Sequence, residues 1–464
     1  MKSTARASKA HILPLCAILF LFLASPGCGR LDMKDIASDT LDPNNLADTE
    51  PSIAVNPKDT KEIAIVAFSE NWNSTTGAPV WKSSDRGKTW RKIFQIVQPA
   101  PGQFGPGDQK IDFDADGNLY VAELASDADL FDYVYRQNPG ADDPLAPGAS
   151  YGDDQPHLSV DSHAASPTKG RLYSPWLDFS QTNPRSSIAR SADKGITINS
   201  VGAGNNSSFA NRTTRSAIAP NGRVYFVYKI REGSTGAPAG FENVHFTVNR
   251  SDDGGVTWTG LGANGISVHG SPQVQTFFTT SFGNPAKGKV ARARSSDAWI
   301  AADPANGDVY VAYVSRDASG FAQIYAARST DEGATWTSTR VTDGTHHSAY
   351  PEIAVTKRGV VGVLYVDFDD SGAATIFRHR FARSFNRSQT WSDGILQSMD
   401  PGPLANAASG FLWGDYEGLT AAKNTFYGVF TGESSGRSTP QLDPIFFRQK
   451  SCRWWWLSCW LESE

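Results

Sequence analysis

Cysteine is almost absent from the sequence: four occur in 464 residues, and none lies between Cys28 and Cys452. A zinc site built from paired Cys-x-x-Cys motifs and a cysteine nucleophile are therefore excluded from the long central part of the chain. A basic excess is also missing, since 43 Lys and Arg face 48 Asp and Glu and the formal net charge is −5. A dedicated nucleic-acid-binding protein normally carries such an excess or a basic stripe, so we expect no nucleic-acid partner.

Methionine is scarce too, with three residues, whereas 42 Gly, 26 Pro, 25 Phe, 14 Tyr and 13 Trp are present. Glycine and proline favour tight turns, and aromatic residues favour strands. Charged residues make up 20% of the chain and hydrophobic residues 39%, as in a packed protein rather than a disordered one. The composition predicts an all-β protein of many short strands, and closed β architectures can hold this much chain in one domain.

The N-terminal segment has the pattern of an export signal. Three basic residues precede an apolar run over residues 12–24, and small residues follow it up to Cys28. The run is too short for a permanent membrane span. The end of this segment resembles a bacterial lipobox, so we expect export, with a lipidated Cys28 as first mature residue favoured over free secretion. The signal peptide would cover residues 1–27, and residues 28–47 are expected to be a linker.

The C-terminal residues 451–464 form a separate tail that is rich in tryptophan and cysteine. In an oxidising compartment Cys452 and Cys459 form an even pair, so a disulfide that closes a short loop around Trp454–Trp456 is one expectation. A loose tail is the alternative.

The strongest signal in the chain is an internal repeat with the pattern Ser-x-Asp-x-Gly-x-Thr-Trp. Intact copies occur at Ser83–Trp90, Ser251–Trp258 and Ser329–Trp336, and degenerate copies at Ser191–Ile198 and Ser384–Trp391. The Asp side chain can accept hydrogen bonds from the amides of a hairpin turn, Gly can adopt a positive φ, and Trp can pack on the same sheet. The repeat resembles the Asp-box of sialidases and related β-propellers, and the resemblance covers most of the mature chain.

A second repeat consists of an apolar strand, a polar turn and an alternating strand rich in Tyr and Val. Seven such pairs occur: residues 52–55 with 63–66, 111–113 with 118–122, 158–160 with 171–173, 217–219 with 224–228, 300–302 with 309–313, 353–355 with 361–365, and 419–421 with 426–430. With the Asp-box copies placed between the third and fourth strands, each pair predicts one four-stranded blade. We expect a single β-propeller over residues 48–450, with seven blades favoured and six, the usual number in sialidases, as the alternative.

In a propeller, the innermost strand of each blade begins at the mouth of the central channel. Three positions before the first buried aliphatic residue of the seven units stand Glu50, Asp108, Gln155, Arg215, Asp297, Tyr350 and Tyr416, with Arg212 and Asp415 close by. Acids, tyrosines and arginines in one ring are typical of a polar pocket that binds a glycan. We predict a substrate-binding ring; the alternative is that these residues only solvate a water-filled channel.

The resemblance to sialidases implies catalytic roles for particular residues. Sialidases use a tyrosine nucleophile at the head of the last blade, and the segment Trp413–Leu419 places Tyr416 at the corresponding position. A phenol can replace the usual carboxylate nucleophile because an anionic sugar repels a second anion. The acid/base residue is expected in the loop before the first Asp-box, where Glu70 is the candidate.

Two parts of the sialidase pattern are not found at their expected places. The first arginine of the carboxylate-binding triad is expected at the head of the first blade, where Thr49 and Glu50 stand instead. Glu50 would repel the carboxylate of sialic acid. The expected acid/base aspartate is also missing. The arginines that could complete an anion site, with no motif to fix them, are Arg212, Arg215, Arg292 and Arg294.

The segment Asp112–Glu123 matches the spacing of an EF-hand calcium loop. Its flanks are predicted strands rather than helices, and the same layout recurs at residues 306–310 and 221–225 without the full set of carboxylates. We therefore interpret the segment as a hairpin turn, and we expect no metal site and no cofactor.

These patterns lead to two main hypotheses about function. The first is an exported, sialidase-like glycoside hydrolase that acts on glycans, a candidate exo-sialidase with Tyr416 as nucleophile. The second is a propeller of the same fold that binds a glycan or a protein without catalysing a reaction, and an assembly or scaffold role is a weaker third. We expect a monomer in the cell envelope whose only link to a membrane is a lipid anchor at Cys28.

Overall fold

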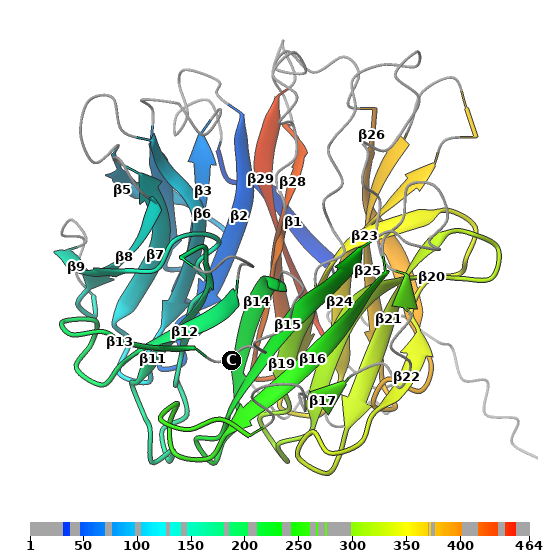
Figure 1. The fold of residues 1–464 in the computed structure, drawn as a ribbon. Helices are drawn as coiled ribbons and strands as arrows, with labels where there is room; N and C mark the ends of the chain where they lie inside the picture. The colour runs from blue at the N-terminus through cyan, green and yellow to red at the C-terminus, as the bar shows by residue number, and fades with distance from the viewer. Residues whose placement is uncertain are drawn as a thin grey trace, which may run out of the picture.

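The computed structural model describes residues 31–37, 47–69, 77–97, 104–126, 130–140, 146–180, 185–202, 211–233, 243–259, 266–267, 274–275, 298–369, 371–372, 376–400, 416–434 and 441–451. These residues form strands, turns and bends, and within them no helix is long and apolar enough to cross a membrane. Seven small antiparallel sheets stand around a common centre as the blades of a β-propeller (Figure 1). The prediction of an all-β propeller with seven blades is confirmed.

The first three blades follow the chain from inner to outer strand. Blade one contains β2 (Asp48–Val55), β3 (Ile63–Ser69), β4 (Ala78–Ser83) and β5 (Arg91–Ile96). Blade two contains β6 (Phe104–Phe113), β7 (Leu119–Ser126), β8 (Leu130–Gln137) and β9 (Ala146–Tyr151). Blade three contains β10 (Ser159–Val160), β11 (Leu172–Asp178), β12 (Arg185–Ser191) and β13 (Asn199–Gly202).

The next three blades repeat this order. Blade four contains β14 (Asn211–Ile218), β15 (Val224–Gly233), β16 (Asn243–Ser251) and β17 (Ile266–Ser267), and β18 (Val274–Gln275) also pairs with β16. Blade five contains β19 (Trp299–Ala302), β20 (Val309–Arg316), β21 (Ala322–Ser329) and β22 (Thr337–Arg340). Blade six contains β23 (His347–Val355), β24 (Val361–Asp369), β25 (Ile376–Ser384) and β26 (Ser392–Met399).

Blade seven closes the propeller by joining strands from both ends of the described chain. It contains β27 (Gly418–Ala422), β28 (Thr425–Glu433), β29 (Leu442–Lys450) and, outermost, β1 (Leu31–Asp35). β1 runs antiparallel to β29, and Arg448 donates a hydrogen bond to Asp32 over 2.7 Å. The assignment of residues 28–47 to a linker is therefore wrong at residues 31–35, which are the fourth strand of the last blade.

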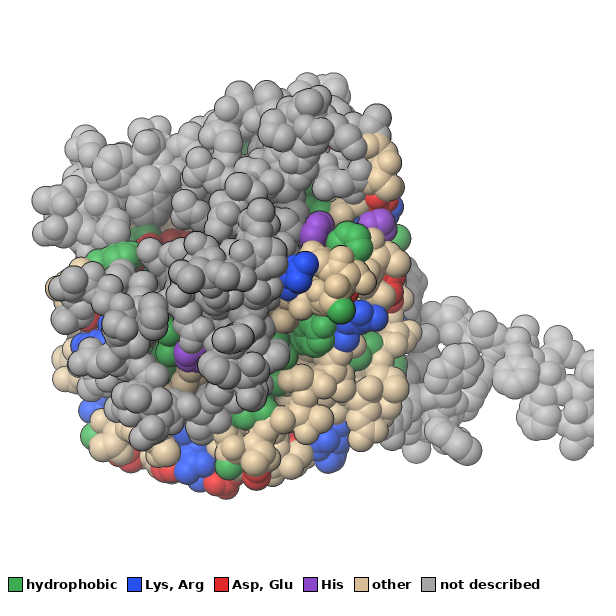
Figure 2. Space-filling view, turned by 45° about the vertical axis from the view of Figure 1, so that its right-hand side comes forward, with side chains coloured by type: hydrophobic (Ala, Val, Ile, Leu, Met, Phe, Trp, Pro, Cys, Tyr) green, Lys and Arg blue, Asp and Glu red, His purple; other side chains and the backbone are tan. Residues whose placement is uncertain are grey.

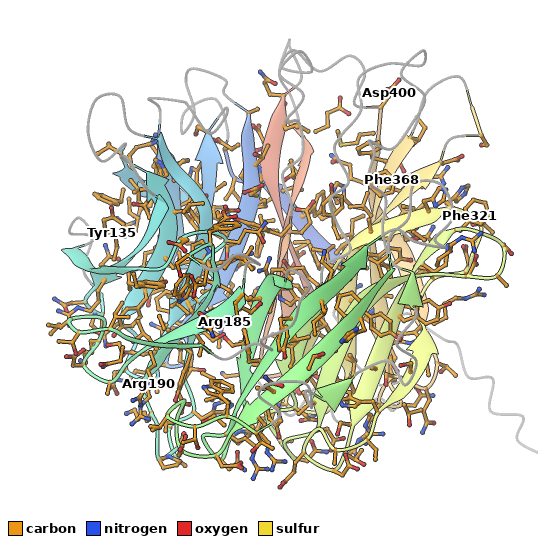
Figure 3. All side chains as sticks on the ribbon, viewed as in Figure 1. Tyr135, Arg185, Arg190, Phe321, Phe368 and Asp400 are labelled. Atoms are coloured by element: carbon orange, nitrogen blue, oxygen red, sulfur yellow. The ribbon has the colours of Figure 1, made fainter. Side chains whose placement is uncertain are left out.

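Hydrophobic clusters join each blade to the next. Seven clusters of buried residues correspond to the seven interfaces between blades. The cluster between blades five and six, for example, includes Tyr310 from β20 and Val363 from β24. Side chains fill the space between the sheets (Figure 3). Because the core lies between blades, the inner strands that line the axis can carry polar residues.

The five copies of the first repeat form the same turn between the third and fourth strands of their blades. In the first copy Asp85 accepts hydrogen bonds from the amides of Lys88 over 3.0 Å and Thr89 over 2.9 Å. Gly87, with φ of 83°, donates its amide to the Ser83 hydroxyl over 2.8 Å. Equivalent bonds from the fifth and seventh residues of the pattern occur in the other four copies. The sequence interpretation of these segments as hairpin turns is confirmed.

The described surface carries charges of both signs. On the face shown in Figure 2, Lys and Arg side chains are interspersed with Asp and Glu side chains along the lower edge of the molecule. On this edge the charges therefore form no stripe of one sign, in keeping with the near balance of charge in the sequence.

Candidate active site in the central channel

Residues near the beginning of several inner strands share an unusual backbone conformation. Glu50, Asp108, Gln155 and Tyr350 have φ values of 52°, 52°, 51° and 55°, in the left-handed region that residues with a side chain rarely adopt. At Glu50, Asp108 and Tyr350 the pairing with the next strand also shifts by one residue, which marks a β-bulge. Such conformations are costly and cluster at functional sites. Four of the seven positions aligned from the sequence thus share a structural feature.

Tyr416 lies where several charged residues converge, and it is only 4% exposed. The Lys110 ammonium is 3.5 Å from the centroid of its ring, and the Arg215 guanidinium carbon is 5.8 Å from it. Burial, followed by the charges of Glu50 and Asp108, raises the pKa of Tyr416 well above its usual value, while Arg215 opposes this. The hydroxyl makes no hydrogen bond of good geometry to the described residues, although the Glu50 carboxylate lies near enough to act on it as an acceptor.

Lys110, on β6, is a buried cation next to this phenol. Its side-chain nitrogen makes no hydrogen bond within the described part of the chain. Burial lowers the pKa of Lys110 to about 7, with Glu352 opposing this shift and Arg215 adding to it. At neutral pH the ammonium is therefore charged in only part of the molecules.

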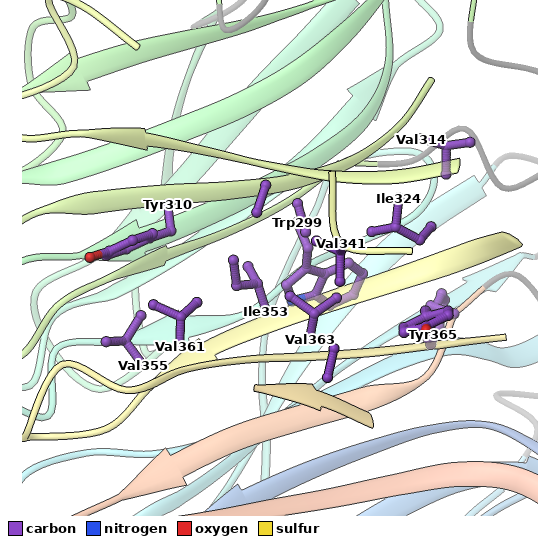
Figure 4. Packing of buried hydrophobic residues seen from close by; sticks show 14 of the residues in the cluster. Trp299, Tyr310, Val314, Ile324, Val341, Ile353, Val355, Val361, Val363 and Tyr365 are labelled. Carbon is purple, nitrogen blue, oxygen red and sulfur yellow. The ribbon is translucent and has the colours of Figure 1, made fainter. Parts of the chain in front are cut away.

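Trp299, at the start of β19, provides an aromatic surface for both cations. The Arg215 guanidinium carbon lies 4.3 Å from its ring centroid and the Lys110 ammonium 4.5 Å, which are cation–π distances. The indole is held among Ile353 and Val363 in the cluster between blades five and six (Figure 4). The aromatic surface is thus fixed by core packing.

Glu352, on β23, links blade six to the strand that follows Tyr416. One of its carboxyl oxygens accepts a hydrogen bond from the amide of Leu419 over 3.0 Å, and the other makes none to the described residues. Burial raises the pKa of Glu352 to about 8, although Lys110 and Arg215 oppose this shift. At neutral pH this carboxyl group is therefore mostly protonated.

Glu417, the residue after Tyr416, attaches this segment of backbone to β28. Its carboxylate accepts a hydrogen bond from the amide of Thr431 over 2.8 Å, and the His379 imidazole lies 3.3 Å from it. His379 is fully buried and stacks on Phe430 with ring centroids 4.2 Å apart. Burial lowers the pKa of His379 to about 3, so the imidazole is neutral and acts as a hydrogen-bonding partner. Glu417 is a positioning residue for the Tyr416 segment.

The structure brings together part of the predicted ring. Glu50, Asp108, Arg215 and Tyr416 act on one another at one point of the channel. Gln155 and Tyr350 occupy the equivalent backbone positions in their blades, and Arg212 lies on β14 with only its backbone described. The other predicted residues lie outside the described residues: Glu70, Arg292, Arg294, Asp297, Asp415, Cys28, Cys452 and Cys459.

Four residues of the site were not predicted from the sequence: Lys110, Trp299, Glu352 and His157, whose ring centroid lies 5.5 Å from that of Trp299. Each stands two residues after a position of the predicted ring, at the head of the same inner strand. Moving the alignment of the seven units by two positions would have identified them.

The segment that resembles a calcium loop forms a turn. Asp114 accepts hydrogen bonds from the amides of Asp116 and Asn118, both over 2.9 Å, and from the Tyr120 hydroxyl over 3.0 Å. Its carboxylate is therefore used inside the hairpin. Among the residues that the structure describes, no group of three or more His, Cys, Asp or Glu side chains is placed to hold a metal ion.

A cavity of about 290 Å³ lies along the channel. Lys110 and Glu352 line one end, and residues further along the inner strands, such as Ala302 and Ala421, line the other. The described residues of the ring are not part of its lining. The cavity therefore extends from the Lys110 layer in the direction away from the ring.

Comparisons with known proteins bear on the fold. No protein-family model and no curated protein matches the chain. Among solved structures, an ulvan lyase described as a new polysaccharide lyase family, PL25, has a TM-score of 0.53 at 9% identity, over 86% of this chain and 93% of the lyase. An ulvan lyase of that family bound to -[GlcA(1-4)Rha3S]- has a TM-score of 0.52 at 10% identity, over 86% and 94%. The Hadza microbial sialidase Hz136 has a TM-score of 0.43 at 15% identity, over 88% and 67%. The similarity to the lyases shows a shared fold.

Proposed function

We propose that this chain is an exported, sialidase-like propeller that cleaves glycans at the ring end of its channel, with Tyr416 as the nucleophile. The observation that carries the proposal is the convergence of the carboxylates of Glu50 and Asp108 and the cations of Lys110 and Arg215 on one buried phenol. Groups with strongly shifted pKa values next to specific charges are typical of catalytic centres. The oligosaccharide bound to an ulvan lyase of similar fold supports a glycan as the substrate. The proposal that the protein is exported is based on the sequence of residues 1–28.

The raised pKa of Tyr416 decides how the attack would proceed. Because the phenolate is scarce at neutral pH, the proton has to leave the hydroxyl as the oxygen attacks the anomeric carbon. Glu50 is placed to accept that proton, since its carboxylate already acts on the hydroxyl. A bond between the sugar and Tyr416 forms, the aglycone leaves with a proton, and water then releases the sugar. Glu70 remains the predicted proton donor to the leaving group.

The charges around Tyr416 favour a neutral sugar over sialic acid. Arg215 attracts an anionic sugar, but Glu50 and Asp108 repel it, and burial leaves Lys110 only partly charged. A site in which two acids stand beside two cations attracts the carboxylate of sialic acid less strongly than a triad of arginines would. We therefore expect little turnover of a sialoside and more of a neutral glycoside.

A glycan- or protein-binding propeller without catalysis is the second candidate. It is favoured by Thr49 and Glu50, which stand where the resemblance to sialidases implies an arginine. In this reading the ring only recognises its ligand, and Tyr416 contributes a single hydrogen bond.

Turnover of a panel of aryl glycosides, a sialoside included, by wild type and by Tyr416→Phe tests the proposal. Tyr416→Phe removes only the phenolic oxygen, so it should abolish turnover while the far-ultraviolet circular dichroism stays unchanged. Glu50→Gln should lower turnover by about 10²- to 10⁴-fold, the usual contribution of a general base. Tyr313→Phe, a tyrosine on β20 whose hydroxyl bonds Ser338 over 3.0 Å, is the matched control and should keep full activity.

Two outcomes of this experiment would contradict the proposal. Turnover that survives Tyr416→Phe unchanged would remove Tyr416 from the mechanism. No turnover by wild type on any member of the panel, together with glycan binding that Tyr416→Phe weakens by about 0.5–1.5 kcal/mol at most, would identify a binding propeller.

A further inference from the structure

Both ends of the described chain lie at one corner of blade seven. Leu31, the first residue of β1, pairs with Gln449 near the end of β29. Two residues later, Ser451 donates its amide over 2.8 Å and its hydroxyl over 2.9 Å to the carbonyl of Asn424, in the turn between β27 and β28. The segments before residue 31 and after residue 451 therefore leave the propeller at the same place.

The sequence next to this corner contains residues that interact with membranes. Cys28, the expected lipidation site, stands three residues before Leu31, and Trp454 stands three residues after Ser451. Three residues span about 10 Å at most, so both are tethered within about that distance of the corner. Four tryptophans occur in residues 454–460, and tryptophan prefers the interface between a bilayer and water.

Turns of blades six and one pack against blade seven at this corner. The amide of Lys357, in the turn between β23 and β24, donates a hydrogen bond over 2.7 Å to the carbonyl of Lys423, in the turn between β27 and β28. On the other side, Gly87 of blade one lies so close to β29 that a Cβ added to it would be 2.3 Å from the ring of Phe446. The three blades therefore present one continuous surface here.

This surface is rich in lysine and arginine. We name it the basic corner, and its members are Lys61, Arg86, Lys88, Lys357, Arg358 and Lys423. All of them are exposed except Arg86, which is half-buried. The same turns contain three acids, Asp59, Glu62 and Asp85. Of these, Glu62 pairs with Lys82, and Asp85 accepts the hydrogen bonds of its own turn. Positive charge therefore prevails at the corner, although the chain as a whole has a formal net charge of −5.

The cations at the same end of blades four and five are paired with acids instead. Arg223 lies 2.6 Å from Glu332, and Arg328 lies 2.6 Å from Asp308. Among the described residues, by contrast, no ion pair involves Lys357, and the same holds for Lys423. An unbalanced cationic surface attracts a partner that carries negative charge.

We propose that the basic corner docks on the surface of a membrane that contains anionic lipids, with the tryptophans of the C-terminal tail at the interface. Each Lys or Arg near such a surface strengthens binding about fivefold. Leu31 and Met33, which are 36% and 38% exposed at the outer edge of blade seven, add apolar surface beside the corner. A lipid on Cys28 would hold the chain at the same place, but the docking does not require it. It is also independent of the proposed function of the ring.

Docking at this corner would give the ring a defined orientation. The inner strands β2 and β23 contain Glu50 and Tyr350 near their beginnings, and the turns with Lys61 and Lys357 follow their ends. The ring and the basic corner therefore lie at opposite ends of the inner strands. A docked propeller holds the ring away from the bilayer and open to the surrounding solution.

Sedimentation with lipid vesicles tests the proposed partner. The protein without residues 1–27 and with Cys28→Ser keeps every described residue and carries no lipid. It should bind vesicles of phosphatidylcholine with added phosphatidylglycerol, which is anionic, and not vesicles of phosphatidylcholine alone. Binding should weaken as salt screens the charges. Equal binding to the two kinds of vesicle, or no binding to either, would overturn the proposal.

Substitution of exposed lysines locates the docking surface. The double variant Lys357→Gln/Lys423→Gln should weaken binding to the anionic vesicles by about tenfold or more. It should fold as wild type does, because the hydrogen bond between these two residues joins backbone atoms. The matched control Lys169→Gln/Lys194→Gln removes two exposed lysines from turns of blade three and should bind within about threefold of wild type. Equal losses in the two double variants would show that only net charge matters, and would refute a docking surface at the corner.

Fluorescence quenching by brominated lipids tests the role of the tail. Bromine quenches at short range, so anionic vesicles with brominated acyl chains should lower the tryptophan fluorescence of the bound protein. The variant Trp454→Ser/Trp455→Ser/Trp456→Ser should lose most of this quenching. Quenching that stays undiminished in the variant would contradict the placement of the tail at the interface. Circular dichroism shows whether each variant is folded, and if the tail variant fails to fold, the two lysine variants decide the matter.

Discussion

Glu123 allows a test of buried charge in this propeller that needs no ligand. It lies on β7 of blade two with no exposed surface. One carboxyl oxygen accepts a hydrogen bond from the Tyr135 hydroxyl over 2.8 Å, and the other makes none to the described residues (Tyr135 is labelled in Figure 3). Burial raises the pKa of Glu123 from 4.5 to about 8, and the bond from Tyr135 opposes this only in part.

This shift makes the stability of the protein depend on pH in a defined direction. Between the two pKa values the folded state keeps a proton on Glu123 that the unfolded state has lost, so the free energy of unfolding falls as the pH rises. The stabilisation that this proton provides is complete below the pKa of Glu123 in the unfolded state. It is lost as the pH rises through the pKa of Glu123 in the folded state. Each pH unit in this window is worth at most about 1.4 kcal/mol, so the loss from about pH 5 to about pH 8 is at most about 4 kcal/mol.

Glu123→Gln should remove this part of the pH dependence. The amide oxygen can still accept the hydrogen bond from Tyr135, and glutamine does not titrate. The variant should therefore gain stability relative to wild type as the pH rises, by up to about 4 kcal/mol near pH 8. Urea unfolding at several pH values, followed by circular dichroism, measures the difference. Glu332→Gln, whose side chain is 56% exposed, is the control and should follow the wild-type curve. Parallel curves for wild type and Glu123→Gln would refute the reasoning.

Two further predictions concern the repeated turn. Asp85→Ala should destabilise the protein by about 1–2 kcal/mol because the turn amides lose their acceptor, whereas Asp85→Asn should be nearly neutral, since Asn386 accepts the equivalent amide bond over 2.9 Å in the fifth copy; equal losses in urea unfolding would contradict this. Gly87→Ala places a Cβ 2.3 Å from the Phe446 ring at φ of 83°, while Gly195→Ala at φ of 80° meets its nearest atom at 3.4 Å. Both substitutions should destabilise the protein because alanine disfavours the left-handed backbone, and Gly87→Ala should destabilise it by about 1–3 kcal/mol more because of the clash. Equal melting temperatures of the two variants would show that no clash occurs.

The fold could be predicted because its repeats leave a regular mark on the sequence. Seven strand pairs and five turns give the number of blades without reference to any long-range contact. β1 was missed because it has only five residues, of which two are Asp and one is Lys, and because its two apolar residues, Leu31 and Met33, are exposed at the outer edge of blade seven. Its partner strand also lies more than 400 residues away along the chain, at Leu442–Lys450. An edge strand of this kind is too short for its alternation to stand out as a pattern.

The site was predicted only in its outer layer. Counting back from the aliphatic residue of each unit identifies Glu50 and Tyr416, and the left-handed bulge at several of these positions explains why they form a set. Lys110 and Glu352 were missed because lysine and glutamate are almost never fully buried, so an inner strand that contains them suggests a solvated channel wall. Their burial follows from the closure of seven blades around one axis, and no local segment of the sequence contains that information.

The separation of core and channel explains how the propeller can hold such a cluster. The hydrophobic clusters lie at the seven interfaces between blades, so the packing that stabilises the propeller does not require apolar side chains on the axis. Lys110 and Glu352 each have a polar atom without a hydrogen-bond partner among the described residues, and these atoms cost free energy, as does the left-handed backbone at Glu50 and Tyr350. A channel selected for stability alone would pair or replace these groups, because a buried charge can often be exchanged for a packed apolar residue without loss. Their concentration on the axis, where the core does not need them, is what the proposed function predicts.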